Sequence, residues 1–311
     1  MLEKCRLFQI GKDAIKWLEN FLLNRKQYVE LEGSKSNTLE TGPYGVVQGG
    51  RSSGELFLYF LNDLPLQLAK KTDPKDTCDS TGKEFVDDVN ILTKATSIPK
   101  LLKQVELDYN KLHQYLVNHK MCINSSKTQF MILMPPKNTE DLTITIDNNK
   151  INHQDSIKVL GVTLSANMKF DCHIWQGKES MLRSLNRKTA LLRTIKPYIS
   201  TAQLSNVGAS LINSTILYAA PLWGATTKSN IQKVQSNQIK AARIIKNESW
   251  KRTKKKKHRQ ELLDELNWPN TQQIINAATN NLTKRAISAK SSAGLMTFLK
   301  RQLSCMPENI K

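Results

Sequence analysis

The spacing of apolar residues predicts a helix and then a strand near the start of the chain. Apolar residues recur at helical intervals through residues 12–24, and they alternate with polar residues over residues 27–32. A glycine- and serine-rich turn that begins at Val46 leads into an apolar stretch, which predicts a second helix ending near Asn62 and Pro65. This opening segment therefore mixes helix and strand.

The central part of the chain continues the mixed pattern. Residues 83–92 have the pattern of a strand, a tight turn and a strand, and Ser97 followed by Pro99 predicts the start of a long helix. The buried stripe of that helix is expected at Leu101, Val105, Tyr109, Leu112 and Leu116. Further strands are predicted at residues 128–134, 142–146 and 157–164, with a hairpin turn at Asp147-Asn148-Asn149.

Beyond about residue 166 the alternating pattern stops and helical spacing takes over. Helices are predicted near residues 171–195, 201–218, 230–246 and 271–300. Ser200 and Gln203 have the spacing of a capping box at the start of the second of these helices. We therefore predict an α+β fold with an antiparallel sheet in residues 1–166, a helical region in residues 167–250 and a basic helical region in residues 251–311.

The net charge of the chain limits the kinds of molecule that it is expected to bind. Lys and Arg number 46 against 27 Asp and Glu, which gives a formal net charge of +19. Such an excess favours a nucleic acid, although an anionic membrane surface would satisfy the same charge. The apolar stretch at residues 209–225 is interrupted by Asn213 and Pro221 and is too short for a bilayer span, so it predicts a buried helix. The run Lys251–Arg259 has three interpretations: an RNA-binding tract, a nuclear localisation signal or a solvated linker.

The cysteines and the start of the chain indicate an intracellular protein, in the nucleus, the cytoplasm or both. The five cysteines stand singly, none has the spacing of a zinc site, and the odd number argues against a disulfide framework. The first residues are amphipathic and charged and contain no apolar signal core, so secretion is not expected.

Two adjacent acids, Asp87 and Asp88, carry the strongest chemical signal. They follow Phe85-Val86 and are flanked by apolar residues, which predicts the tip of a β-hairpin. Neighbouring carboxylates repel each other, but they suit a site for Mg²⁺ or Mn²⁺ because these hard cations prefer oxygen ligands. The alternative is that the pair is an ordinary polar turn, since Asp favours turns.

Three further segments bear on whether the acid pair is a metal site or an ordinary polar turn. Gln48, Gly49 and Gly50 stand at the entry of a helix, where exposed backbone N–H groups allow a phosphate or base to approach closely. Lys127 follows the acid pair downstream, and residues 157–162 form an apolar strand with a glycine turn. Taken alone, these would be an ordinary loop, a solvated surface lysine and a buried strand.

In this order and spacing the segments resemble one family, the reverse transcriptases of non-LTR retrotransposons of the LINE and jockey kind. The resemblance is carried by WLENFLLNRKQYVEL, GVVQGGRSSGELFLYFLNDLP, FVDD, NSSKTQFM and IKVLGVTL, and beyond them by YAAPLWG and QIKAARII. It implies a partial polymerase palm and fingers in residues 1–166, a thumb-like region in residues 167–250, and RNA-templated DNA synthesis. The implied partners are an RNA template, a DNA primer and deoxynucleoside triphosphates, with no membrane.

The resemblance also implies roles for individual residues. Asp87 and Asp88 would be the catalytic metal ligands for Mg²⁺ or Mn²⁺, and Phe85 would pack beneath their hairpin. The nucleotide and template would lie against Gln48, Gly49 and Gly50. Lys127 would act near the leaving pyrophosphate, where a cation can stabilise charge or donate a proton. The primer would be gripped by Lys158, Leu160 and Gly161.

The sequence departs from the family pattern in three places. The first catalytic Asp motif and the segment that covers the templating base are expected before Met1, Gly50 replaces the commoner Ser, and SSGEL replaces LGPLL. Because phosphoryl transfer depends on fixed carboxylates, we expect a truncated or degraded element product, or a partial gene model, that binds nucleic acid but catalyses poorly or not at all. The alternatives are a non-catalytic basic protein that binds RNA or DNA and, third, a helical protein on a membrane surface.

Overall fold

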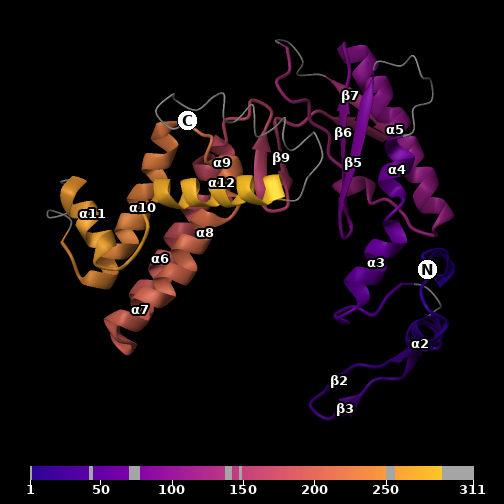
Figure 1. The fold of residues 1–311 in the computed structure, drawn as a ribbon, viewed down its shortest axis with the longest axis horizontal. Helices are drawn as coiled ribbons and strands as arrows, with labels where there is room; N and C mark the ends of the chain where they lie inside the picture. Colours follow the sequence, from indigo (N-terminus) through magenta and orange to yellow (C-terminus); the bar gives the residue numbers. More distant parts are fainter. Residues whose placement is uncertain are drawn as a thin grey trace. The chain divides into compact units, whose positions relative to one another are not determined.

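The computed structural model describes residues 2–41, 45–69, 78–136, 142–146, 149–249 and 256–288. The chain divides into two compact units, drawn together in Figure 1. Unit 1 comprises Met1–Thr128 and Thr143–Asn152, and unit 2 comprises Gln129–Leu142 and His153–Lys311. This division differs from the predicted ranges, because the strands near residue 160 contact the helices that follow them.

Unit 1 combines five helices with short strands in the part of the chain that the structure describes. The helices are α1 (Leu2–Leu7), α2 (Lys12–Leu22), α3 (Ser53–Leu61), α4 (Leu64–Ala69) and α5 (Ile98–Asn118), with a 3₁₀ turn, η1 (Ser125–Lys127). The strands are β1 (Lys26–Gln27), β2 (Glu30–Leu31), β3 (Ser34–Lys35), β4 (Leu39–Glu40), β5 (Asp79–Phe85), β6 (Asp88–Lys94), β7 (Thr143–Ile146) and β8 (Asn149–Asn152).

The mixed α+β class is confirmed, but the single antiparallel sheet is wrong. The described strands form five separate two-stranded antiparallel pairs: β1–β4, β2–β3, β5–β6, β7–β8 and, in unit 2, β9 (Ser156–Val159) with β10 (Val162–Ser165). A lone pair of strands needs a helix to cover it, because it buries too little surface by itself. Within unit 1, α4 and α5 pack on β5 and β6, and α5 also contacts β7.

Several predicted elements of unit 1 are confirmed. Helix α2 buries Ile15, Leu18 and Leu22, and α5 begins at the predicted place. Pro65 does not end a helix; it lies in the first turn of α4, where its missing N–H costs no hydrogen bond. The core of this unit joins α3 and α4 to α5 through Leu61, Leu64, Leu68, Leu112, Tyr115 and Leu116.

Unit 2 is mainly helical in its described residues. Its helices are α6 (Met181–Ile195), α7 (Thr201–Gly208), α8 (Ser214–Leu217), α9 (Ala220–Trp223), α10 (Lys228–Lys246), α11 (Lys256–Asp264) and α12 (Thr271–Ser288). Two π-turns, η2 (Cys172–Gln176) and η4 (Ala209–Asn213), and a 3₁₀ turn, η3 (Lys196–Tyr198), complete it. The capping box of Ser200 and Gln203 is present.

The structure of unit 2 differs from two of the predicted elements. The strand expected at residues 128–134 is wrong, because this segment forms only an isolated bridge between Phe130 and His153. The helix expected at 201–218 is divided by η4 and ends before Ala219, whose φ of +51° is left-handed. The turn at Asp147-Asn148, most of the run Lys251–Arg259 and residues 289–311 lie outside the described residues.

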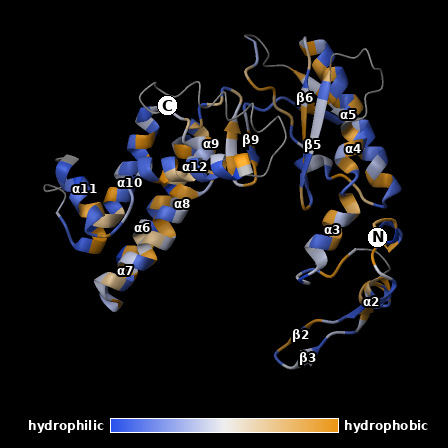
Figure 2. Ribbon diagram, in the orientation of Figure 1, coloured by the Kyte–Doolittle hydropathy of each residue, from blue (hydrophilic) through white to orange (hydrophobic). Residues whose placement is uncertain are grey.

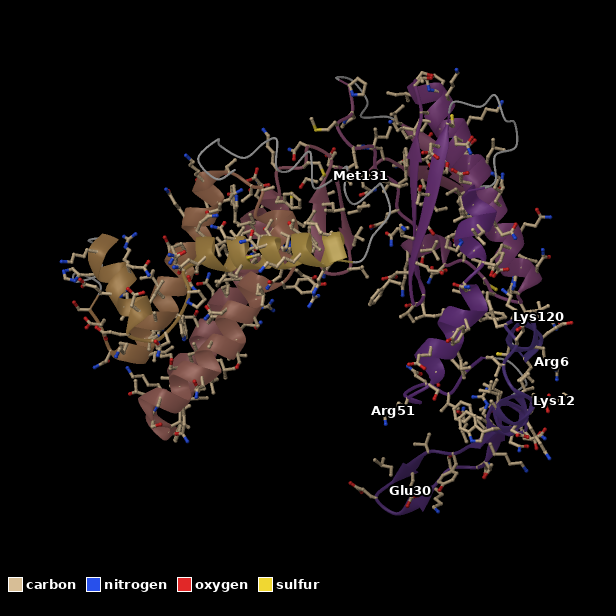
Figure 3. The ribbon with its side chains drawn as sticks, in the orientation of Figure 1. Arg6, Lys12, Glu30, Arg51, Lys120 and Met131 are labelled. Atoms are coloured by element: carbon tan, nitrogen blue, oxygen red, sulfur yellow. The ribbon has the colours of Figure 1, made fainter. Side chains whose placement is uncertain are left out.

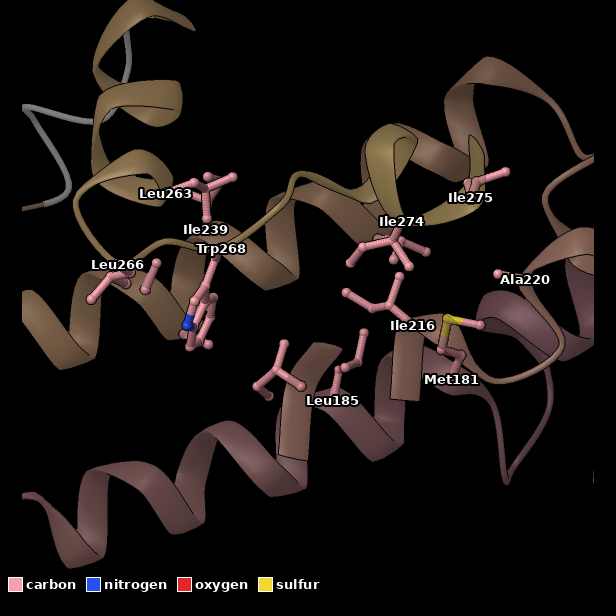
Figure 4. Packing of buried hydrophobic residues seen from close by; sticks show 14 of the residues in the cluster. Met181, Leu185, Ile216, Ala220, Ile239, Leu263, Leu266, Trp268, Ile274 and Ile275 are labelled. Carbon is pink, nitrogen blue, oxygen red and sulfur yellow. The ribbon is translucent and has the colours of Figure 1, made fainter. Parts of the chain in front are cut away.

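The core of unit 2 gathers side chains from α6, α8, α10 and α12, as Figure 4 shows. Leu185, Ile216 and Trp223 have no exposed surface, and burial of each such side chain contributes about 1.5–3 kcal/mol. Hydrophilic and hydrophobic residues alternate around α6 and α10 in Figure 2, as expected for helices with one buried face. The prediction that the apolar stretch 209–225 is one buried helix is wrong, because it is divided into η4, α8 and α9 and Leu217 and Tyr218 are more than half exposed; its buried side chains are Ile212, Ile216, Ala220 and Trp223. No described helix is long and apolar enough to cross a membrane.

Candidate active site

The two candidate metal ligands lie at the closed end of the β5–β6 hairpin. The register pairs Phe85 with Asp88, which leaves Val86 and Asp87 as a two-residue turn. Val86 has a φ of +56°, whereas Asp87 does not have a positive φ. A positive φ at the first turn residue is typical of a type II′ turn and favours glycine, so the β-branched Val86 is strained there.

The carboxylates of Asp87 and Asp88 are exposed and unpartnered. Neither forms a hydrogen bond or an ion pair within the part of unit 1 that the structure describes. Phe85 is 58% exposed, so the prediction that it packs beneath the hairpin is wrong. The turn therefore exposes two acids and an aromatic ring to solvent. The contacts that fix the hairpin to the rest of unit 1 lie along its strands.

A buried acid of α5 holds both strands of the hairpin. Asp108 has no exposed surface, and its Oδ2 accepts hydrogen bonds from the hydroxyls of Ser80 on β5 and Thr93 on β6, the latter at 3.1 Å. Gln104 donates to the other oxygen at 2.8 Å. Ser80 and Thr93 face each other across the strands, so a single carboxylate fixes their register to α5. The sequence predicted only the apolar stripe of this helix and missed Asp108.

A glycine allows α4 to lie directly on the same hairpin. A side chain at Gly82 would place its Cβ 2.5 Å from a methyl carbon of Leu68, which is 2% exposed. Because Gly82 has no Cβ, Leu68 can contact the strand backbone. The hairpin is thus held by α4 through packing and by α5 through hydrogen bonds.

A charged cluster joins α1 to the segment between α3 and α4 and to α5. The ammonium of Lys4 donates to the carbonyl of Phe60 at 2.6 Å, to Asp63 Oδ1 at 2.5 Å and to the Tyr115 hydroxyl at 3.1 Å. The Tyr115 hydroxyl also donates to Asp63 Oδ1 at 2.6 Å. Glu84 on β5 lies close enough to Asp63 and Lys4 for their charges to affect its pKa, and its Oε2 is buried without a hydrogen bond.

The pKa values of this cluster follow from burial and pairing. Burial raises the pKa of Asp63, but hydrogen bonds from Lys4 and Tyr115 outweigh it and leave that pKa below its usual value. Burial and the neighbouring Asp63 raise the pKa of Glu84. Burial and the hydrogen bond to Asp63 also raise the pKa of Tyr115. At neutral pH the ammonium of Lys4 is therefore paired with the carboxylate of Asp63 and lies near the carboxylate of Glu84, which is poorly solvated.

The glycine-rich loop before α3 is tightly turned, and one of the backbone N–H groups expected to be open to a ligand is hydrogen-bonded within the loop. Gly49 has a φ of +80°, and the N–H of Gly50 donates to the carbonyl of Val47 at 3.2 Å. A side chain at Gly50 would place its Cβ 2.5 Å from the Ser53 hydroxyl. Arg51 is exposed and projects from this loop in Figure 3. The loop is therefore closely turned, and it ends at an exposed cation.

The remaining candidates divide between the two units. Lys127 is exposed on η1 in unit 1, where its N–H donates to the carbonyl of Asn124 at 3.1 Å. Lys158, Leu160 and Gly161 belong to the β9–β10 hairpin of unit 2, where Leu160 and Gly161 both have a positive φ and form the turn. Lys158 is paired with Glu179.

The side chains at the β5–β6 turn fit a divalent cation only in part. Among the described residues, no group of three or more His, Cys, Asp and Glu side chains is placed to hold a metal ion. Asp87 and Asp88 still provide neighbouring oxygen donors, and Mg²⁺ is commonly bound by one or two carboxylates, water and substrate phosphates. The donor set suits a cation shared with a phosphate substrate and does not suit a cage made of protein alone.

Comparison with known proteins identifies the family. A family model described as reverse transcriptase (RNA-dependent DNA polymerase) matches residues 2–164, more than half of the chain. The match includes the glycine-rich loop, the acid pair, Lys127 and most of the β9–β10 hairpin. The chain belongs to the reverse transcriptase family.

Two curated relatives come from transposable elements. The chain is 24% identical over 234 residues to an RNA-directed DNA polymerase from mobile element jockey of Drosophila melanogaster, which covers 75% of this chain and 25% of that protein. A polymerase of the same description from Drosophila funebris is 22% identical over 245 residues, which cover 78% and 26%. The chain thus spans about a quarter of the length of the curated relatives that it matches. No solved structure matches the chain.

Proposed function

We propose that this chain contributes the acid pair of a nucleotidyl-transfer site that copies an RNA template into DNA. The observation that carries the proposal is the pair of exposed, unpartnered carboxylates, Asp87 and Asp88, on a hairpin that α4 and α5 hold in place. The two acids stabilise no described part of the fold through a side-chain hydrogen bond or ion pair, and the residue before them carries backbone strain of the kind that clusters at functional sites. Binding of Mg²⁺ or Mn²⁺ would offset the repulsion between the two acids.

The roles of the other residues in unit 1 follow from this assignment. Bound dications would stabilise the attacking and the leaving oxygens of the transfer. Asp87 and Asp88 would hold these ions and so orient the triphosphate of the incoming nucleotide. Gln48, Gly49 and Gly50 would line the nucleotide and template, because the backbone of a turned glycine loop can approach a base or phosphate closely. Lys127 would stabilise charge on the leaving pyrophosphate.

The β9–β10 hairpin would contact the primer strand. Lys158 and Leu160 are partly exposed on it, and the turn at Leu160-Gly161 is fixed by two positive φ values. The implied substrates are an RNA template, a DNA primer and deoxynucleoside triphosphates. A second proposal, favoured by the net charge of +19, is a non-catalytic protein that binds RNA or DNA.

A metal titration of the intact chain tests the first proposal. We expect Asp87→Asn or Asp88→Asn to weaken Mn²⁺ binding, followed by electron paramagnetic resonance, by about tenfold or more, since each removes an anionic oxygen donor. Asp79→Asn is the matched control, because Asp79 is also exposed and lies at the open end of the same hairpin. Equal Mn²⁺ binding by the intact chain and all three variants, with RNA binding retained, would favour the non-catalytic proposal.

A further inference from the structure

An exposed tyrosine from the helical part of unit 2 contacts the turn of the β9–β10 hairpin. The Tyr218 hydroxyl donates a hydrogen bond to the carbonyl of Leu160. Its ring lies 3.5–3.9 Å from the position that a Cβ at Gly161 would occupy. Tyr218 therefore contacts both turn residues, although it is 58 positions from Leu160 in the chain and is itself 54% exposed.

The backbone of Tyr218 is held as firmly as its side chain. Its carbonyl accepts a hydrogen bond from the indole N–H of Trp223 at 3.0 Å, and Trp223 is completely buried. Its N–H donates to the carbonyl of Ser214 at 3.0 Å. The next residue, Ala219, has a φ of +51°, a conformation that costs about 1 kcal/mol or more for a residue other than glycine. Two hydrogen bonds thus hold the backbone of Tyr218, directly before the strained Ala219, while its exposed side chain reaches the Leu160–Gly161 turn.

Several other contacts attach the strands of the hairpin to the helical part of unit 2. Val162, which directly follows the turn, is buried in the core of this unit, and Leu164 packs against that core. The N–H of Thr163 points to Nδ1 of His173, a buried residue of η2, at 3.4 Å. Lys158, directly opposite Thr163, is paired with Glu179 ahead of α6. These contacts hold the strands, and the hydroxyl of Tyr218 holds the turn itself.

We infer that Tyr218 is a positioning residue, which fixes the backbone of the Leu160–Gly161 turn against the helices of unit 2 and so sets the conformation of the turn. The contribution of Tyr218 to hydrophobic stability is small, because half of its side chain is in solvent. The contact of Tyr218 with the turn gives a role to its hydroxyl group, which donates to Leu160, and to the strained backbone of Ala219 beside it. The consequence for primer contact rests on the proposed function, whereas the tie between Tyr218 and the turn does not.

The first test measures the turn itself in the intact chain. Tyr218→Phe removes only the hydroxyl, so we expect backbone amide exchange in residues 156–165 to become faster by about threefold or more, the factor that corresponds to one lost hydrogen bond. Tyr198→Phe is the matched control, because Tyr198 is 83% exposed in the same unit. If exchange in this hairpin is the same in Tyr218→Phe as in the control, the inference is wrong.

The second test connects the turn to the primer. The probes are two duplexes of equal length, one with a recessed DNA 3′ end on an RNA strand and one blunt. We expect the intact chain to prefer the recessed end, and Tyr218→Phe to reduce that preference by about threefold or more with blunt-duplex affinity unchanged. Faster exchange with an unchanged preference would overturn the role in primer positioning. If the unmodified chain shows no preference, the primer assignment of the hairpin fails, while the exchange measurement still decides the role of Tyr218.

Discussion

At the scale of single residues, the β5–β6 turn combines backbone strain with unpaired charge. Val86 occupies a conformation that favours glycine, and the two residues after it are neighbouring acids. Strain of this kind costs on the order of 1–3 kcal/mol and persists only where the surrounding structure enforces it. Asp108 and Leu68 hold the strands of this hairpin at Ser80, Thr93 and Gly82, several residues away from Val86. The turn therefore carries backbone strain directly beside two unpartnered acids.

Replacement of Val86 by glycine tests this strain. We expect Val86→Gly to raise the free energy of unfolding of unit 1 by about 1 kcal/mol, because glycine adopts a positive φ without steric cost and little apolar surface is lost. The measurement is urea denaturation followed by circular dichroism. Val29→Gly is the control: Val29 is 71% exposed and has no positive φ, so this change should not stabilise the chain. A destabilised Val86→Gly variant would contradict the assignment of strain.

Sequence reasoning identified the residues whose chemistry is visible in adjacent positions, and it missed those whose partners are distant. The acid pair and the glycine loop were identified because their spacing is local. Asp108 was missed because its partners, Ser80 and Thr93, precede it by many positions, and an acid at that position in a helix is usually solvated. Tyr218 was part of a recognised motif, but the contact of its hydroxyl with Leu160 has no local signal.

At the scale of elements, the Lys4 cluster joins α1, the segment after α3, and α5, and it lies near Glu84, one residue pair away from the turn of the β5–β6 hairpin. Lys4 is satisfied by three oxygen atoms, whereas Glu84 on β5 has a buried oxygen without a partner. The raised pKa of Glu84 means that its ionised form opposes folding. Its stabilising contribution is therefore complete below its ordinary pKa of 4.5 and is lost as the pH rises through the raised value.

Neutralisation of Glu84 gives a stability change that depends on pH. We expect Glu84→Gln to be more stable than the unmodified chain at pH 7, because the ionised carboxylate is removed, and the difference to shrink as the pH falls toward 4.5. Thermal unfolding at a series of pH values measures it. Glu55→Gln on the exposed side of α3 should show no such trend. A difference that grows on acidification would have the wrong sign for this explanation.

Two helical glycines differ in what surrounds them. A Cβ at Gly208 would lie 2.8 Å from the ring of Trp268 and 2.7 Å from Ile245, whereas nothing lies within 4 Å of a Cβ at Gly54. We expect Gly208→Ala to cost about 1–3 kcal/mol through overpacking, and Gly54→Ala to stabilise by about 0.5–1 kcal/mol through helix propensity. Denaturant unfolding of both variants checks the pair, and a stabilising Gly208→Ala would contradict the packing described here.

The elements that were predicted correctly carry their signal in their own residues. The stripe of α5, the capping box of α7 and the two-residue hairpin at the acid pair each depend on local spacing. The strand expected at residues 128–134 has suitable residues but lacks an adjacent strand to pair with, beyond one bridge to His153. Strand formation depends on a partner, and local propensity does not reveal one.

At the scale of the whole molecule, two units share a chain that is strongly basic. The net charge of +19 is distributed over both units and over residues that the structure does not describe. Apart from the ion pairs at residues such as Lys4 and Lys158, most of this charge lies on exposed side chains. A nucleic acid that lies along the chain would therefore release many counterions on binding.

Salt dependence distinguishes a polyanion partner from other partners. We expect affinity for an RNA–DNA duplex to fall by about 10³-fold or more between 50 and 200 mM salt, as for proteins that make about six or more phosphate contacts. Fluorescence anisotropy at several salt concentrations gives the slope. Vesicles with and without anionic lipid provide the comparison: binding to anionic vesicles alone, with no RNA binding, would favour a membrane-surface protein instead.

The π-turn η4 has a consequence for how the chain tolerates changes in length. It places an additional residue between Gly208, which must face Trp268, and Tyr218, which must face Leu160. Each residue of an α-helix advances the direction of its side chains by about 100°. Deletion of one position in 209–213 would restore a regular helix and yet rotate Tyr218 away from the turn. Variation in this family should therefore preserve the count of residues here more strictly than their identities.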